Sequence, residues 1–222
     1  MSARTPATIE ESEADAPATR GRSRKYTQVL GLINQAAIEV FASEGLAGAS
    51  TQAIADKAGL SKAQLHYYIE SKEALYRQVL QDILTDWIVV FGFDDEAFGP
   101  RKVLSDLIER KMVFSFEHPL RSRIFTAEMM RGAPVINDMM DTSKQRTDQA
   151  AAVIRNWMNQ GLMDSADPML VLFHIWAVTQ FYADHATQAA YYRDAARQGD
   201  DKDRRYLIEQ VTEFLLKGAG VK

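Results

Sequence analysis

Polar, cationic and aromatic residues stand close together in the first half of the chain. They are Lys62, Gln64, His66, Tyr67 and Tyr68. An ammonium group and phenolic hydroxyls bind phosphate oxygens, and a side-chain amide can bond to the edge of a base. Such residues, exposed together on one helix, would suit the major groove of DNA and its phosphates. The segment is therefore a candidate DNA-reading surface.

Two short helices are predicted to hold this surface in place. The first has an apolar ridge of Ala53, Ile54 and Ala58. Its predicted N-cap is Ser50, and Gly59 ends it because the position after a helix favours a left-handed conformation. Ser61 and Gln64 form a capping box at the start of the second helix, whose buried side carries Leu65. Two short helices joined by about four residues around a glycine are a helix-turn-helix.

This helix-turn-helix resembles the DNA-binding motif of tetracycline-repressor-type transcription regulators. The family motif is typically IAxxAGVSKGxLYYHFxSKExL, and residues 54–75 read IADKAGLSKAQLHYYIESKEAL. His66 stands where Tyr is common, Ile69 where Phe is common, and Ala49 where Thr is frequent. The DNA-contacting residues that the resemblance implies are Ser50, Ser61, Lys62, Gln64, His66, Tyr67, Tyr68 and Lys72. The alternative is a three-helix core with a purpose other than DNA binding.

The charge of the chain gathers around this motif. The net charge is −4, which argues weakly against general binding of nucleic acid, but residues 20–77 carry eight basic and five acidic side chains. A basic arm at the start of this region consists of Arg20, Arg22, Arg24 and Lys25. Arg24 is predicted to contact phosphate at the beginning of the first helix. The alternative is that these basic residues form a solvent-exposed flank that does not contact DNA.

The chain divides into three predicted parts. Residues 1–19 contain almost no large apolar side chain and are expected to form a disordered tail. Residues 20–71 are expected to form the helix-turn-helix DNA-binding domain. Residues 72–222 are expected to form a second domain that binds a ligand and dimerises.

Composition and motifs argue against several other classes of protein. The chain has no Cys, hence no disulfide framework or thiolate zinc site, and this fits the cytoplasm. No apolar stretch is long enough to span a membrane, and no secretory signal is expected. The sequence lacks HExxH, GxSxG, P-loop and GxGxxG motifs. We therefore expect neither an enzyme nor a cofactor nor a metal site.

The apolar periodicity is helical throughout. We expect helices over about 24–43, 72–90, 101–116, 120–130, 135–159, 168–185 and 203–217, with a loop over 91–100. Gly45 is predicted to end the first of these helices, and Asp167 is predicted to cap the one that begins with Pro168. The fold class is therefore all-α. The helix over 72–90 begins at the DNA-binding domain and ends in the second domain, so it is the mechanical link between them.

Two helices near the C-terminus predict a homodimer. Residues 169–185 are apolar almost all round, and such a helix must be buried on nearly every side. Residues 206–216 carry an apolar stripe that can pack beside it. Two such helices from each of two chains would form a four-helix bundle with two-fold symmetry. A protein with two-fold symmetry matches a palindromic operator. The alternative is that both helices are buried in the core of a monomer.

One face of the helix over 169–185 is a candidate ligand site. Trp176, Thr179, Gln180 and Ala183 share it at helical spacing, and Trp87 lies near the end of the helix over 72–90. An amide beside an indole on an apolar face is typical of a small-molecule pocket, because the amide both donates and accepts hydrogen bonds. The alternative is that Gln180 is a core residue whose amide bonds to a backbone carbonyl, and that the aromatic side chains only fill the core.

A second resemblance concerns residues 78–190, which are similar to the pyrimidine-utilisation repressors. The similarity lies in DILTDWIV, FTAEMMRGAP and IWAVTQFYADHA, while residues 111–117 and the tail after 190 depart more. It implies uracil or thymine as effector, contacted by Trp87, Trp176 and Gln180. The first alternative is the same regulator with a more apolar effector, such as an amino-acid derivative, an aromatic or an acyl compound. The second is a constitutive architectural DNA-binding protein without an effector.

Overall fold

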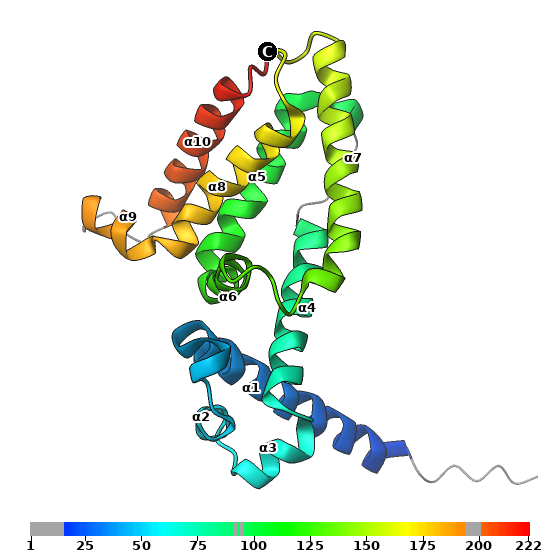
Figure 1. Cartoon of the computed structure of the whole chain (residues 1–222), viewed down its shortest axis with the longest axis vertical. Helices are drawn as coiled ribbons and strands as arrows, with labels where there is room; N and C mark the ends of the chain where they lie inside the picture. The colour runs from blue at the N-terminus through cyan, green and yellow to red at the C-terminus, as the bar shows by residue number, and fades with distance from the viewer. Residues whose placement is uncertain (1–15, 91–92, 94–95, 194–200) are drawn as a thin grey trace, which may run out of the picture.

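The computed structural model describes residues 16–90, 93, 96–193 and 201–222. These residues form α-helices and short 3-10 turns, apart from one isolated bridge between Met163 and Val221. This is the predicted all-α class. Figure 1 shows a lower unit of α1, α2 and α3, an upper unit of α5 to α10, and α4 leading from one to the other. In the part of the chain that is described, no helix is long and apolar enough to cross a membrane.

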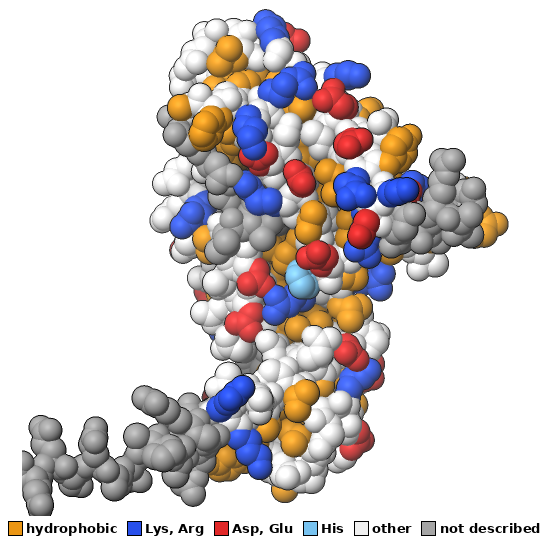
Figure 2. All heavy atoms as spheres, turned by 180° about the vertical axis from the view of Figure 1, so that it is seen from behind, with side chains coloured by type: hydrophobic (Ala, Val, Ile, Leu, Met, Phe, Trp, Pro, Cys, Tyr) orange, Lys and Arg blue, Asp and Glu red, His pale blue; other side chains and the backbone are white. Residues whose placement is uncertain are grey.

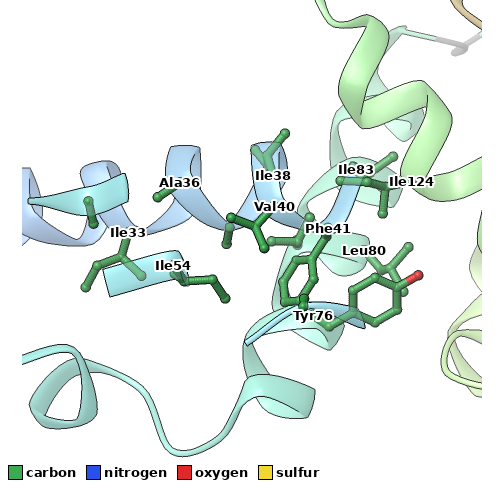
Figure 3. Close-up of a cluster of buried hydrophobic side chains, with 14 of the residues drawn as sticks. Ile33, Ala36, Ile38, Val40, Phe41, Ile54, Tyr76, Leu80, Ile83 and Ile124 are labelled. Atoms are coloured by element: carbon green, nitrogen blue, oxygen red, sulfur yellow. The ribbon is translucent and has the colours of Figure 1, made fainter. Parts of the chain in front are cut away.

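Helix α1 spans Ala16–Gly48 and forms one wall of the lower unit. It starts earlier than the predicted Arg24, so residues 16–19 belong to it, while the rest of the predicted tail lies outside the described residues. Gly45 interrupts the helix with a φ of 67°, at the residue where the sequence predicted its end. The buried face carries Ile33, Ala36, Ala37, Val40 and Phe41 (Figure 3).

Helices α2 (Thr51–Ala58) and α3 (Lys62–Tyr68) form the predicted helix-turn-helix. The Ser50 hydroxyl accepts a hydrogen bond from the Ala53 N–H at 3.0 Å, and Gly59 is left-handed with a φ of 69°. The Ser61 hydroxyl accepts from the Gln64 N–H at 3.2 Å, and the Gln64 amide oxygen accepts from the Ser61 N–H at 2.8 Å. Both caps and the capping box are therefore confirmed.

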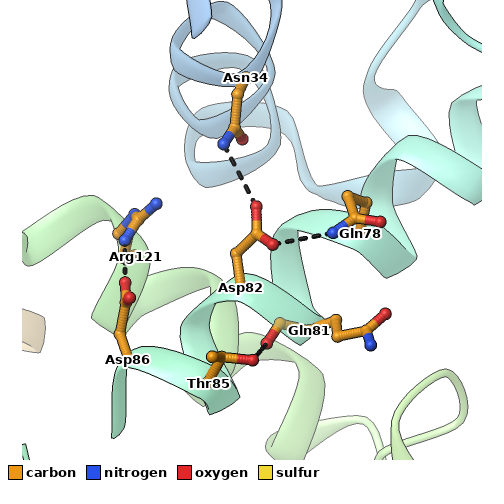
Figure 4. A network of polar contacts seen from close by, with 7 residues as sticks. All are labelled: Asn34, Gln78, Gln81, Asp82, Thr85, Asp86 and Arg121. Carbon is orange, nitrogen blue, oxygen red and sulfur yellow. Dashed lines mark hydrogen bonds and ion pairs between the residues drawn. The ribbon is translucent and has the colours of Figure 1, made fainter. Parts of the chain in front are cut away.

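Helix α4 spans Lys72–Val90, as predicted, and its first half belongs to the core of the lower unit. Tyr76 packs edge-on against Phe41 of α1, with ring centroids 4.9 Å apart. The Asn34 amide donates to Asp82 at 3.3 Å, and Asp86 pairs with Arg121 of α6 (Figure 4). Helix α4 is thus fixed to α1 on one side and to α6 on the other.

Helix α6 (Pro119–Met130) joins the two units. Its Ile124 is buried in the same cluster as residues of α1 and α4 (Figure 3). Ala133 and Ile136 from the turn that follows belong to this cluster too. The lower core is therefore continuous with part of the second predicted domain. A rigid α6 would move α1 and α4 with it, because interiors this closely packed transmit displacement.

The upper unit has its own core between the remaining long helices. These are α5 (Gly99–Glu117), α7 (Met140–Asn159), α8 (Pro168–Asp184) and α10 (Asp201–Gly218). The Asp167 carboxylate accepts from the Met169 N–H at 2.8 Å, which confirms the predicted cap of α8. Leu104, Ile108 and Ile154 are fully buried in this core.

Two elements differ from the sequence-based expectation. The helix expected over 135–159 begins only at Met140, after the 3-10 turn Asn137–Met139. The reason is that the Val135 N–H donates to the Glu128 carboxylate at 2.6 Å, which holds the chain in a turn. The short helix α9 (Ala186–Tyr192) was not predicted. The predicted loop over 91–100 lies partly outside the described residues, and Gly99 already belongs to α5.

Candidate functional site

The outward side of α3 carries most of the residues predicted to read DNA. It presents Ser61, Lys62, Gln64, His66 and Tyr67 to solvent. Leu65 is fully buried beneath α3 and fixes which side faces out, so that Tyr67 is 77% exposed. Tyr68 is half-buried because its ring lies 5.2 Å from that of Tyr26 on α1. The surface is polar, cationic and aromatic, as the sequence predicted, and Leu65 anchors it on the core of the lower unit.

Several predicted DNA-contacting residues also hold the lower unit together. The Ser50 and Ser61 hydroxyls and the Gln64 amide oxygen serve the helix caps, which leaves the Gln64 NH₂ group for a base edge. The Lys72 ammonium donates to the Ala49 carbonyl at 2.8 Å and so fixes the start of α4 against the start of α2. Arg24 is exposed on α1. A phosphate contact by Lys72 stays a prediction, and removing its side chain would also loosen α4.

A cavity of about 720 Å³ lies in the upper unit among α4, α5, α6, α7 and α8. Trp87, Trp176 and Gln180 all line it, so the structure brings together three predicted ligand residues from distant parts of the chain. Most of the remaining wall is apolar, with Leu84, Leu107, Phe125, Leu172 and Phe173 among its residues. A concave, mostly apolar space with a few polar groups is the usual form of a small-molecule site.

Thr179, the fourth predicted ligand residue, does not line the cavity. It is fully buried against α5, where its hydroxyl donates to the Ile175 carbonyl at 2.7 Å and its own carbonyl accepts from the Ser115 hydroxyl at 3.0 Å. The physical reason is the helical turn of about 100° between neighbouring residues, which separates Thr179 from the face of Gln180. Thr179 therefore packs α8 on α5, and its prediction as a ligand contact is corrected.

The Gln180 amide belongs to a polar corner of the cavity. Its NH₂ group donates to the Asp184 carboxylate at 3.0 Å and to the Thr126 hydroxyl at 3.2 Å. The Thr126 hydroxyl in turn donates to Asp184 at 2.8 Å. A carboxylate accepts only, so Asp184 fixes the orientation of the amide. The amide oxygen of Gln180 is therefore the group that remains for a ligand, and it would accept a hydrogen bond from a ligand N–H.

Aromatic rings and a buried lysine form another part of the wall. The Trp87 ring lies 4.1 Å from that of Phe125, and the Lys111 ammonium is 5.5 Å from the centroid of Trp87. Lys111 is only 5% exposed, and burial lowers its pKa to about 7. Sequence reasoning missed this residue. The signal was present, because Lys111 continues the buried stripe of Leu104 and Leu107 at helical spacing.

A buried carboxylate connects the wall of the cavity to the lower unit. Glu128 of α6 is fully buried, and it accepts from the Tyr76 hydroxyl of α4 at 3.2 Å and from the Val135 N–H at 2.6 Å. Burial of the Tyr76 hydroxyl, and after it the negative charge of Glu128, raise the pKa of Tyr76 to about 12. Thr126, two residues earlier on the same helix, bonds to Gln180. Helix α6 thus both lines the cavity and bonds to α4.

Two family models match the chain. Residues 33–79 match the model described as "Bacterial regulatory proteins, tetR family", and residues 80–222 match that described as "YcdC-like protein, C-terminal region". The HTH-type transcriptional regulator RutR of Escherichia coli strain K12 is 35% identical over 201 residues, which cover 90% of this chain and 94% of RutR. RutR of Shigella flexneri gives the same values.

Solved structures share the fold. The putative transcriptional regulator SCO4942 from Streptomyces coelicolor is 24% identical with a TM-score of 0.68, and the match covers 87% of this chain and 99% of that one. AibR in complex with isovaleryl coenzyme A and operator DNA is 17% identical with a TM-score of 0.61, covering 85% and 96%. At these identities the likeness concerns the arrangement of helices alone.

The buried ammonium of Lys111 predicts a distinct dependence of stability on pH. Its folded pKa of about 7 lies below its ordinary value of 10.5, so the unfolded chain binds more protons between these values. This group should therefore make the free energy of unfolding increase as pH rises. Between about pH 7 and about pH 9, the free energy of unfolding of the wild type should increase by about 2 kcal/mol more than that of Lys111→Met. Urea unfolding of both proteins measures this, and parallel pH profiles would contradict it.

Proposed function

The chain belongs to the tetR family of bacterial regulatory proteins, and we propose that it is a repressor whose hold on operator DNA is released by a small planar heterocycle. Family membership makes it a ligand-responsive DNA-binding transcription regulator rather than an enzyme. One observation carries the proposal: an exposed reading helix and a large, mostly apolar cavity occur in one chain, and α4 and α6 bond them together. Such a chain senses and acts without a second protein.

The proposed effector is a pyrimidine such as uracil or thymine. The ring would lie between Trp87 and Trp176, and a ring N–H would donate to the Gln180 amide oxygen. The conjunction of two indoles and an oriented amide supports this, as does the relation to RutR. A more apolar effector is the second candidate, which the largely apolar wall of the cavity favours. It would leave the Gln180 oxygen without a donor at a cost, so we favour the pyrimidine.

The proposed assembly is a homodimer through α8 and α10. Apolar side chains stay exposed on these two helices outside the cavity, namely Leu170, Phe181, Tyr206 and Phe214. Phe214 is 70% exposed and Phe181 37%. Large apolar side chains that stay exposed on neighbouring helices are typical of an interface. A two-fold axis through this face would set two α3 helices in successive major grooves, about 34–36 Å apart on a palindromic operator.

A constitutive architectural DNA-binding protein is less well supported. Such a protein needs a broadly basic surface, because phosphate neutralisation supplies its affinity. Over the face in Figure 2, acidic and basic side chains alternate across the upper unit. The cavity would also have no purpose in that class.

The proposed signal passes from the cavity to α4 through α6. A ligand on Gln180 would alter the bonds that its amide makes to Thr126 of α6. Glu128 and Arg121 of the same helix bond to Tyr76 and Asp86 of α4, so a shift of α6 would change the angle of α4 and of the reading helix. The ligand must bind one arrangement more tightly than the other, since otherwise no equilibrium moves.

The first functional prediction concerns the reading surface. Lys62→Ala should weaken binding to operator and to random DNA alike, because an ammonium on a phosphate carries no sequence information. The slope of log affinity against log salt should become shallower by about one unit. Lys217→Ala on α10 is the control. Fluorescence anisotropy over a salt series measures this, and unchanged slopes in both variants would remove Lys62 from the interface.

The second functional prediction concerns the interface of the proposed dimer. Phe181→Glu would bury an unpaired carboxylate between subunits at a cost of about 3–5 kcal/mol. The variant should therefore sediment as a monomer at micromolar concentration and lose the palindromic operator. Leu162→Glu, between α7 and α8, is the control and should stay dimeric. A wild-type protein that is itself monomeric in analytical ultracentrifugation would exclude the interface.

The third functional prediction concerns the proposed effector. Gln180→Ala should lower the affinity for uracil or thymine by about one to two decades, because a ligand N–H would lose its acceptor in a mostly apolar cavity. It should still shift operator DNA but no longer release it when the base is added. Gln160→Ala, at the exposed end of α7, should behave as wild type. Calorimetry decides: equal affinity of Gln180→Ala and wild type would put the site elsewhere, and no binding of either base would reject a pyrimidine.

A further inference from the structure

The cavity is long as well as large. Helix α8 leads from the top of the upper unit down towards α6 (Figure 1), and its lining residues extend from Met169 to Gln180. That distance is about three turns, or about 16 Å of helix axis. A pyrimidine ring beside Gln180 would cover about one of these turns. The volume of about 720 Å³ likewise suits a drug-sized ligand rather than a single small ring.

The two ends of the cavity differ in chemistry. The lower end, towards α6, holds the polar corner in which the Gln180 amide bonds to Thr126. The upper end is formed by apolar side chains that belong to the core between the long helices, namely Phe93, Leu107, Ala150, Met169 and Leu172. The Phe93 ring stacks on that of Trp157 in the last turn of α7, with centroids 6.0 Å apart. The cavity therefore offers hydrogen bonds at one end and apolar contact at the other.

The other polar groups of the lining do not alter this division. The Thr147 hydroxyl donates to the Ser143 carbonyl at 2.9 Å, so its hydrogen is used within α7. Lys111 lies beside the ring of Trp87, which packs against the core of the lower unit. The charged residues that α7 adds to the lining are exposed, namely Lys144, Arg146 and Asp148. The upper end is thus an apolar chamber.

We propose that the effector is a pyrimidine ring that carries an apolar substituent, and that this substituent lies along α8 in the upper end of the cavity. The inference rests on the proposed function, since it adds a second part to the ligand of the same cavity. The ring N–H would donate to the Gln180 amide oxygen, as proposed above. The substituent would extend past Trp176 to Leu172 and Met169, over about 10 Å of helix axis.

The geometry of the ring decides where the substituent is attached. In uracil, N3–H and C6 lie at opposite sides of the ring. A ligand that donates N3–H to Gln180 therefore directs a group on C6 away from the polar corner and towards the apolar chamber. Each methylene that leaves water for such a chamber should tighten binding by about fourfold.

The test uses a series of uracils and calorimetry on the full-length protein. The probes are uracil, 6-methyluracil, 6-propyluracil and 6-hexyluracil. Their control is 3-hexyluracil, an isomer of the last probe that has the same apolar chain but no N3–H. Ala150→Phe and Met169→Trp add bulk to the upper end from α7 and from α8, so either folded variant alone is sufficient. Ala152→Phe places the same side chain on the exposed side of α7 and is the matched control.

Wild type and Ala152→Phe should bind 6-hexyluracil about a hundredfold or more tightly than 6-methyluracil, and also more tightly than 3-hexyluracil. Ala150→Phe and Met169→Trp should bind uracil as wild type does but lose the gain from the longer chains. Affinities that do not rise with chain length in the wild type would overturn the inference. So would a gain that survives unchanged in both upper-end variants.

The same data separate this inference from the proposed function. Binding of uracil without any gain from the chain rejects the substituent and retains the pyrimidine. Equal binding of 3-hexyluracil and 6-hexyluracil, without binding of uracil and without loss in Gln180→Ala, rejects the pyrimidine and with it the inference. Absence of binding by every probe at millimolar concentration overturns both.

Discussion

The buried carboxylate of Glu128 is the constraint on which the arrangement of the two units depends. A charge with no exposed surface is costly unless it is bonded, and Glu128 satisfies this need through the Tyr76 hydroxyl and the Val135 N–H. Those donors belong to α4 and to the turn before α7. One side chain therefore fixes the helix that leaves the DNA-binding unit, the helix beneath the cavity, and the start of the next long helix.

This constraint gives α6 its place in the proposed mechanism. Its Ile124 is packed in the lower core, and its Thr126 belongs to the polar corner around Gln180. A helix held at both ends by packing and by buried hydrogen bonds moves as one body, since closely packed interiors do not deform continuously. A ligand that changes the bonds of Gln180 would therefore act on α1 and α4 together, and the reading helix would follow.

Local signals made most of the fold predictable from the sequence. The caps at Ser50, Gly59 and Ser61 depend only on neighbouring residues, so their positions in the chain were enough. The orientation of residues that are fixed by tertiary packing could not be predicted in this way. The sequence could not tell that Thr179 faces α5, because Trp176, Thr179 and Gln180 lie within a little more than one turn. Lys111 escaped notice for a related reason, since a lysine on an apolar stripe is ordinarily taken as its solvent edge.

In the proposed mechanism, occupation of the cavity moves the two reading helices of a dimer. Spin labels on Ala63, which is exposed on α3, allow the distance between the helices to be measured by pulsed electron resonance. Saturating uracil should change the mean distance between the labels by about 2 Å or more in the wild type. Gln180→Ala should keep its original distance at the same concentration. A wild-type protein that binds uracil with no change in the distribution of distances would contradict the account.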